Sequence, residues 1–148
     1  MSKRHRQARR AALRVLYAAD VADDTPDDAL ANVRDTLRDE GDNPDRYWDQ
    51  VVRRVRGVFD DIERIDDEIR TLSTNWRIER MAAVDRNLLR LGVFEILHDV
   101  TPPLVAINAC VELAKEFGTA STPGFINGLL DQLCQNHDIP IEPPDSSR

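Results

Sequence analysis

The chain has 148 residues, of which 41% are hydrophobic and 32% are charged, and its formal net charge is −7. This composition is typical of a globular protein whose length suffices for one domain with a sizeable core. No apolar run reaches the roughly 18 residues of a membrane span, and the basic start lacks the apolar stretch of a secretion signal. We therefore expect a cytoplasmic protein that has no membrane partner.

Charge is distributed unevenly along the chain. Six of the 20 Lys and Arg residues lie within the first 14 positions, and no acid precedes Asp20. A chain this acidic should not bind nucleic acid indiscriminately. A local basic element can still bind it at a defined place.

The first predicted helix carries both an apolar face and a basic face. Its apolar positions recur at helical spacing and are Ala8, Ala11, Ala12, Val15, Leu16 and Ala19. On a helical wheel Lys3, Arg6, Arg10, Arg14 and Tyr17 form a narrow stripe on the opposite side, flanked by Arg4 and Arg9. Cations near a helix N-terminus oppose the helix dipole and repel one another, so the stripe favours an external polyanion. A frayed basic terminus that aids solubility is the alternative.

Helix-start signals punctuate the rest of the chain, and no strand-like alternation of useful length occurs. These signals are Thr25-Pro26-Asp27-Asp28, Asn43-Pro44-Asp45, Thr101-Pro102-Pro103 and Thr122-Pro123. They predict a short helix with Leu30, Val33 and Leu37 inward, a long helical segment over 48–72, an almost wholly apolar central helix over 84–97, and helices over 104–117 and 125–134. Gly57 weakens the long segment by about 1 kcal/mol relative to alanine, which leaves a bend there open. We predict a single all-α domain over residues 1–138 and a disordered tail over 139–148.

Catalytic and metal-binding patterns are missing from the sequence. His5, His98 and His137 are scattered, and no phosphate-binding loop or nucleophile motif occurs. Asp60-Asp61 and Asp66-Asp67 are interpreted as a solvated helix face. The two cysteines, Cys110 and Cys134, fall at apolar helix positions and are expected to be buried free thiols. We expect no enzyme activity, no metal and no cofactor.

Three segments together resemble the NusB family of bacterial transcription antitermination factors. They are "RQARRAALRVLY" (6–17), "NWRIERMAAVDRNLLRLGVFEIL" (75–97) and "PLVAINACVELAKEFGTASTPGFINGLLD" (103–131). The resemblance implies an all-α fold of about seven helices in two three-helix bundles packed across each other. It also implies binding to boxA-type RNA from ribosomal RNA operon leaders, together with the small-subunit ribosomal protein NusE. Further implications are entry into the RNA polymerase elongation complex through other Nus factors, and a homodimer in some relatives.

The resemblance also assigns site residues. Those expected to contact RNA are Arg4, Arg6, Arg9, Arg10, Arg14 and Tyr17 on the first helix, and Lys115, Phe117, Gly118, Ser121 and Phe125 around a later turn. Two aromatic rings near a turn can stack on unpaired bases, although a core role remains open for both phenylalanines. Glu79 and Asp85 match the acids of the family's partner face, and Arg86 beside them is assigned to the same face, with a solvated helix face as the alternative. A helical adaptor whose basic stripe meets an acidic protein is the rival function.

Overall fold

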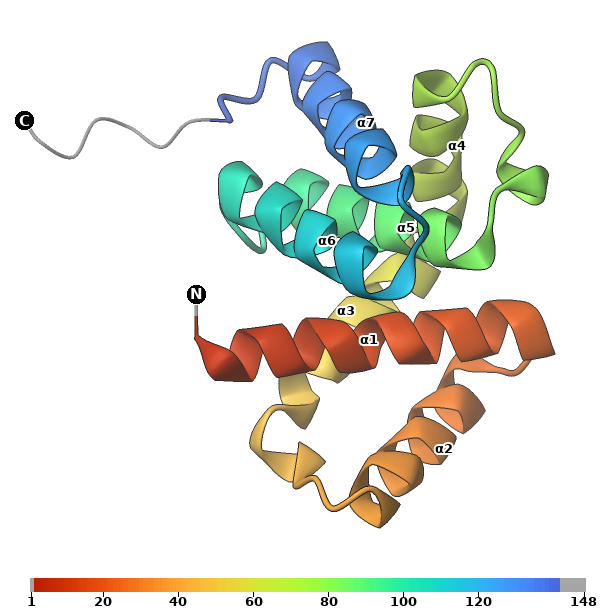
Figure 1. Ribbon diagram of the computed structural model, residues 1–148, viewed down its shortest axis with the longest axis vertical. Helices are drawn as coiled ribbons and strands as arrows, with labels where there is room; N and C mark the ends of the chain where they lie inside the picture. The colour runs from red at the N-terminus through yellow and green to blue at the C-terminus, as the bar shows by residue number, and fades with distance from the viewer. Residues whose placement is uncertain (1, 142–148) are drawn as a thin grey trace, which may run out of the picture. The chain divides into compact units, whose positions relative to one another are not determined.

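The computed structural model describes residues 2–141, and the regular secondary structure in that range is entirely helical (Figure 1). Its elements are α1 (Lys3–Ala22), α2 (Pro26–Asp39), the 3-10 helix η1 (Pro44–Arg46), α3 (Trp48–Asp60), α4 (Ile62–Leu72), the 3-10 helix η2 (Ile78–Arg80), α5 (Ala83–Leu97), α6 (Pro103–Phe117) and α7 (Thr122–Asn136). They form two compact units, Met1–Asp61 and Ile62–Arg148. The prediction of an all-α fold with about seven helices is confirmed over residues 2–141, where three α-helices lie in the first unit and four in the second.

In the first unit α1 packs against both α2 and α3. Every residue of the predicted apolar face of α1 is buried, from Ala8 through to Ala19. The Ser2 hydroxyl accepts a hydrogen bond from the backbone N–H of His5, so the helix does extend back to Lys3. The basic residues therefore lie on an ordered and capped helix.

The start of α2 follows the predicted pattern. Thr25 caps it through a hydrogen bond from the Asp28 backbone N–H, Pro26 occupies the first helical position, and acids fill the first turn. An acid there is stabilised by the helix dipole. By contrast, the signal around Pro44 begins only the short helix η1, and α3 starts at Trp48.

The long segment over 48–72 is two helices, and the break between them falls at Asp61 and not at Gly57. Gly57 lies inside α3, which ends at Asp60, and the backbone N–H of the following Asp61 donates to the carbonyls of Val58 and Phe59. The next helix starts at Ile62. Because apolar residues continue at helical spacing on both sides of Asp61, periodicity alone does not reveal the break.

In the second unit α5 is the central helix, in contact with α4, α6 and α7. Its buried residues include Leu88, Leu89, Leu91, Val93, Phe94 and Ile96, which confirms that it is covered on several sides. Cys110 and Cys134 are both buried free thiols, as expected, and burial raises the pKa of Cys134.

Two further predictions concern a membrane-spanning helix and the C-terminal tail. Within residues 2–141 no helix is both long and apolar enough to cross a membrane. Most of the predicted tail, 142–148, lies outside the described residues. The backbone N–H of Ile139 still donates to the carbonyl of Cys134, so the described chain remains bonded to the end of α7 up to this residue.

Candidate functional site

The basic stripe of α1 consists of Lys3, Arg6, Arg10, Arg14 and Tyr17. Its first three members are exposed, the Tyr17 side chain is 42% exposed, and Arg14 is half-buried. The first turn of the helix holds no acid. The stripe therefore offers cations and one aromatic ring along a single helix face.

The two flanking arginines differ in their surroundings. Arg4 is exposed, but Arg9 is only 2% exposed. The helical wheel placed Arg9 beside the stripe, whereas the structure buries it together with its neighbour Ala8. A buried guanidinium is not available to a phosphate at the surface, so Arg9 does not contribute to the exposed face.

Glu40, the residue that follows α2, also belongs to this surface. Arg14 donates two hydrogen bonds to the Glu40 carboxylate, with N–O distances of 2.9 and 3.4 Å. This contact holds the pKa of Glu40 below its usual range, chiefly through the hydrogen bond. Sequence reasoning missed Glu40, because it lies far from Arg14 along the chain and no local pattern links them.

The second predicted RNA-contacting region is the turn between α6 and α7. Lys115 is exposed and pairs with Glu112 at 3.1 Å. Phe117 is 39% exposed, and Ser121, in the turn that follows it in the chain, is also exposed. Phe125 is half-buried, so both phenylalanines keep part of their surface in solvent.

Thr122 organises this turn, although its sequence signal indicated a different role. The predicted cap is wrong by one position, because α7 begins at Thr122 and Ser121 precedes it. The Thr122 hydroxyl accepts a hydrogen bond from the Thr119 N–H and donates one to Asp85, both at 3.0 Å. A Cβ on Gly118 would lie 2.5 to 2.7 Å from three atoms of Thr122, so only glycine fits there without a shift.

The predicted partner-face residues also have internal contacts. Asp85, on α5, accepts the hydrogen bond from Thr122 and so positions the turn. Arg86 donates to the backbone carbonyls of Ile78 and Met81, each at 3.1 Å, and thereby fastens the segment that precedes α5. Glu79 is exposed and lies 3.8 Å from Arg70.

The same segment carries an exposed aromatic residue that sequence reasoning did not single out. The Trp76 side chain is 66% exposed. Its neighbours in sequence are Asn75 and Arg77, both polar and exposed. A tryptophan in such a polar context is the signal that could have identified it, because an isolated aromatic without apolar neighbours does not fit the core pattern.

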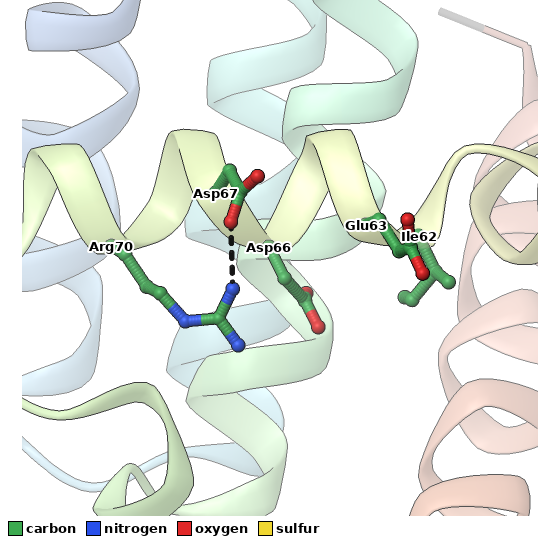
Figure 2. Close-up of a pocket in the computed structure, with 5 residues that line it drawn as sticks. All are labelled: Ile62, Glu63, Asp66, Asp67 and Arg70. Carbon is green, nitrogen blue, oxygen red and sulfur yellow. Dashed lines mark hydrogen bonds and ion pairs between the residues drawn. The ribbon is translucent and has the colours of Figure 1, made fainter.

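A shallow pocket lies along α4 and is lined by Ile62, Glu63, Asp66, Asp67 and Arg70 (Figure 2). Figure 2 shows the ion pair from Arg70 to Asp67 within this one helix.

The interpretation of Asp66 as solvated is wrong, because Arg90 on α5 binds it bidentately at 2.8 and 2.9 Å and its side chain is only 13% exposed. Among residues 2–141 no group of three or more His, Cys, Asp or Glu side chains could hold a metal ion.

Comparisons with known proteins agree with this architecture. The NusB family model matches residues 6–135. The transcription antitermination protein NusB of Anaeromyxobacter dehalogenans (strain 2CP-1) is 41% identical over 144 residues, which cover 90% of this chain and 92% of that protein.

Solved structures give the same result. Thermotoga maritima NusB is 30% identical, with a TM-score of 0.77 over 91% of this chain and 93% of its own. A crystal structure of the antitermination factors NusB and NusE in complex with double-stranded RNA is 25% identical, with a TM-score of 0.80 over 92% of this chain and 99% of that one. Because the family model spans most of the sequence and a relative above 40% identity spans nearly all of it, this chain belongs to the NusB family of transcription antitermination proteins.

Proposed function

We propose that this chain is a non-enzymatic antitermination factor that binds boxA-type RNA of ribosomal RNA operon leaders together with NusE. In this proposal the RNA-bound pair joins the RNA polymerase elongation complex through other Nus factors. A solved relative that contains NusB, NusE and double-stranded RNA supports the choice of both partners. The observation that carries the proposal is the basic stripe on α1.

The helix dipole opposes the cations at the start of the stripe. Its first turn places cations where the helix dipole is already positive, at a cost of some tenths of a kcal/mol each, and no acid precedes Asp20. A phosphate backbone offsets both the unfavourable helix dipole and the repulsion among the cations. Arginine forks match phosphate oxygens bidentately, and the exposed ring of Tyr17 can stack on a base.

The α6–α7 turn adds a second element suited to RNA. Phe117 is exposed and Phe125 is half-buried, and Lys115 adds a cation nearby in sequence. Bases stack on aromatic rings with little regard to their identity, which suits contact with unpaired nucleotides. Ser121 and the backbone N–H groups at the start of α7 favour a phosphate. We assign the turn to RNA on this basis.

We assign the partner face to the segment between α4 and α5. Glu79 is exposed there, and Arg86 holds the backbone of the segment in place. Trp76 extends this face, because exposed tryptophans are enriched among the residues that dominate protein interfaces. Asp85 belongs to this face in the family pattern, and its bond to Thr122 ties it to the α6–α7 turn.

The test of RNA binding is a pair of matched double variants. Arg6→Ala with Arg10→Ala removes two charges from the stripe. Arg46→Ala with Arg53→Ala removes two exposed charges elsewhere in the same unit. The stripe variant should weaken binding to a fluorescent boxA RNA at least tenfold and lower the salt slope by about 1 to 2, because each phosphate contact contributes to that slope.

The control variant should bind the RNA as the parent does, and both variants should keep the parent's circular dichroism spectrum. Equal binding by the parent and the stripe variant would reject the stripe as the RNA site. Parent binding that is weak and the same for boxA and scrambled RNA would instead favour the helical adaptor.

A further inference from the structure

The carboxylate of Glu40 occupies the fork of Arg14 in the way a phosphate would. Both terminal nitrogens of Arg14 donate to it, at 2.9 and 3.4 Å, one to each oxygen. The Arg14 side chain remains 34% exposed and the Glu40 side chain 50% exposed. The pair therefore lies at the surface, where an incoming anion can reach it.

The fold brings these two residues together at some local cost. Glu40 follows the last residue of α2, and its backbone N–H still donates to the Thr36 carbonyl. The end of a helix carries partial negative charge and disfavours a carboxylate. Asp42 adds a like charge that opposes ionisation of Glu40, yet the Arg14 contact outweighs it and lowers the pKa of Glu40. The ionised carboxylate is thus held at the stripe by Arg14.

We propose that Glu40 competes with RNA for Arg14. Before Arg14 can bind the RNA, one of the RNA phosphates must displace the Glu40 carboxylate. The inference rests on the proposed function and adds a specificity-determining residue to it. An exposed ion pair is weak, so an RNA that also engages Arg6 and Arg10 can displace Glu40. A polyanion that touches the stripe at a single point gains little from the exchange.

The same contact affects the salt dependence of RNA binding. While Glu40 neutralises Arg14, a contact between this arginine and a phosphate releases fewer counterions, so the contact adds less to the salt dependence of binding. Removing the carboxylate should therefore raise the affinity for RNA and also steepen its salt dependence. Both effects require Arg14, and this requirement separates competition from a general change in net charge.

The experiment is a double-mutant cycle on binding of fluorescent boxA RNA, measured by anisotropy at two salt concentrations. Glu40→Gln keeps the size of the side chain and removes its charge. We expect it to bind RNA about two- to fivefold more tightly than the parent at the lower salt, the range expected for loss of an exposed ion pair. In an Arg14→Ala background the same substitution should change nothing.

Asp39→Asn is the matched control, since Asp39 is the exposed neighbour of Glu40 and the substitution removes the same charge. It should leave the affinity for RNA unchanged. The inference is overturned if Glu40→Gln has no effect, if its gain persists without Arg14, or if Asp39→Asn gives the same gain. Weaker RNA binding by Glu40→Gln also overturns it, because Glu40 would then position Arg14 for RNA. A parent that binds no RNA rejects the proposed function itself.

Discussion

Replacing Gly118 with alanine should destabilise the turn between α6 and α7. The added Cβ would lie 2.5 Å from the Cβ of Thr122, 2.6 Å from its Oγ1 and 2.7 Å from its Cγ2. Thr122 is only 1% exposed, so its side chain has no solvent-filled space into which it can turn. Gly118 has an extended backbone that any residue adopts, so the constraint is steric and not conformational.

The size of the effect follows from these contacts. Carbon atoms pack at about 3.5 to 4.0 Å, so the turn must open by about 1 Å. Overpacking of this kind costs about 1 to 3 kcal/mol. If Thr122 moves instead, it loses hydrogen bonds to Thr119 and Asp85 that contribute about 1 kcal/mol or more each. Alanine recovers about 0.4 to 1 kcal/mol by restricting the unfolded chain, so the net loss is about 1.3 kcal/mol at the middle of these ranges and at most about 2.6 kcal/mol.

Urea denaturation followed by circular dichroism measures this loss directly. Gly128→Ala is the control, because Gly128 lies within α7 and nothing lies within 4 Å of the position that a Cβ would take. It should leave stability unchanged or raise it by up to about 1 kcal/mol, the difference in helix propensity between the two residues. Unchanged stability in Gly118→Ala, or an equal loss in the control, would refute the steric argument.

Three further predictions concern the rest of the fold. Asp66→Asn should lower the free energy of unfolding in urea by about 1 to 3 kcal/mol, because it leaves Arg90 without its carboxylate; this range lies between the values for exposed and buried ion pairs. Asp67 lies on the exposed side, so Asp67→Asn should cost under about 1 kcal/mol. Hydrogen bonds from arginines lower the pKa of Asp45 below its ordinary 3.8, so its contribution to stability is present above about pH 4 and lost as pH falls through the folded pKa. Asp45→Asn should therefore flatten the acid side of a plot of melting temperature against pH. A thiol reagent should not react with the native protein and should modify both cysteines after unfolding, because they are buried and the pKa of Cys134 is raised.

Each of these predictions has a contradicting result. Equal losses for Asp66→Asn and Asp67→Asn would mean that burial does not strengthen the contact to Arg90. An acid limb that is the same in Asp45→Asn and in the parent would mean that this carboxylate does not contribute to the pH dependence of stability. Rapid thiol modification of the native protein would show that the second unit opens readily.

The helices were predictable where local chemistry decides them. Thr25 and Pro26 start α2 where the capping pattern indicates, and the apolar spacing of α1 and α5 identifies their buried faces. The end of α3 at Asp60 was not predictable, because the apolar positions continue at helical spacing on either side of it.

The burial of individual charged residues could not be predicted from the sequence. Arg54 is 1% exposed and donates to the carbonyl and side chain of Gln50. Glu95 is fully buried and accepts a hydrogen bond from Thr101. A sequence pattern assigns such residues to a solvated face, because the partner that permits burial is known only from the fold. Arg9, buried beside the stripe, is misplaced for this reason.

RNA recognition by the basic stripe is tested most directly by fluorescence anisotropy of boxA RNA and a scrambled RNA, with and without the organism's own NusE, at two salt concentrations. The protein should prefer boxA RNA, bind it more tightly when NusE is present, and lose affinity steeply as salt rises. Equal and weak binding to both RNAs, unaffected by NusE, would contradict the account and favour the helical adaptor whose basic stripe meets an acidic protein.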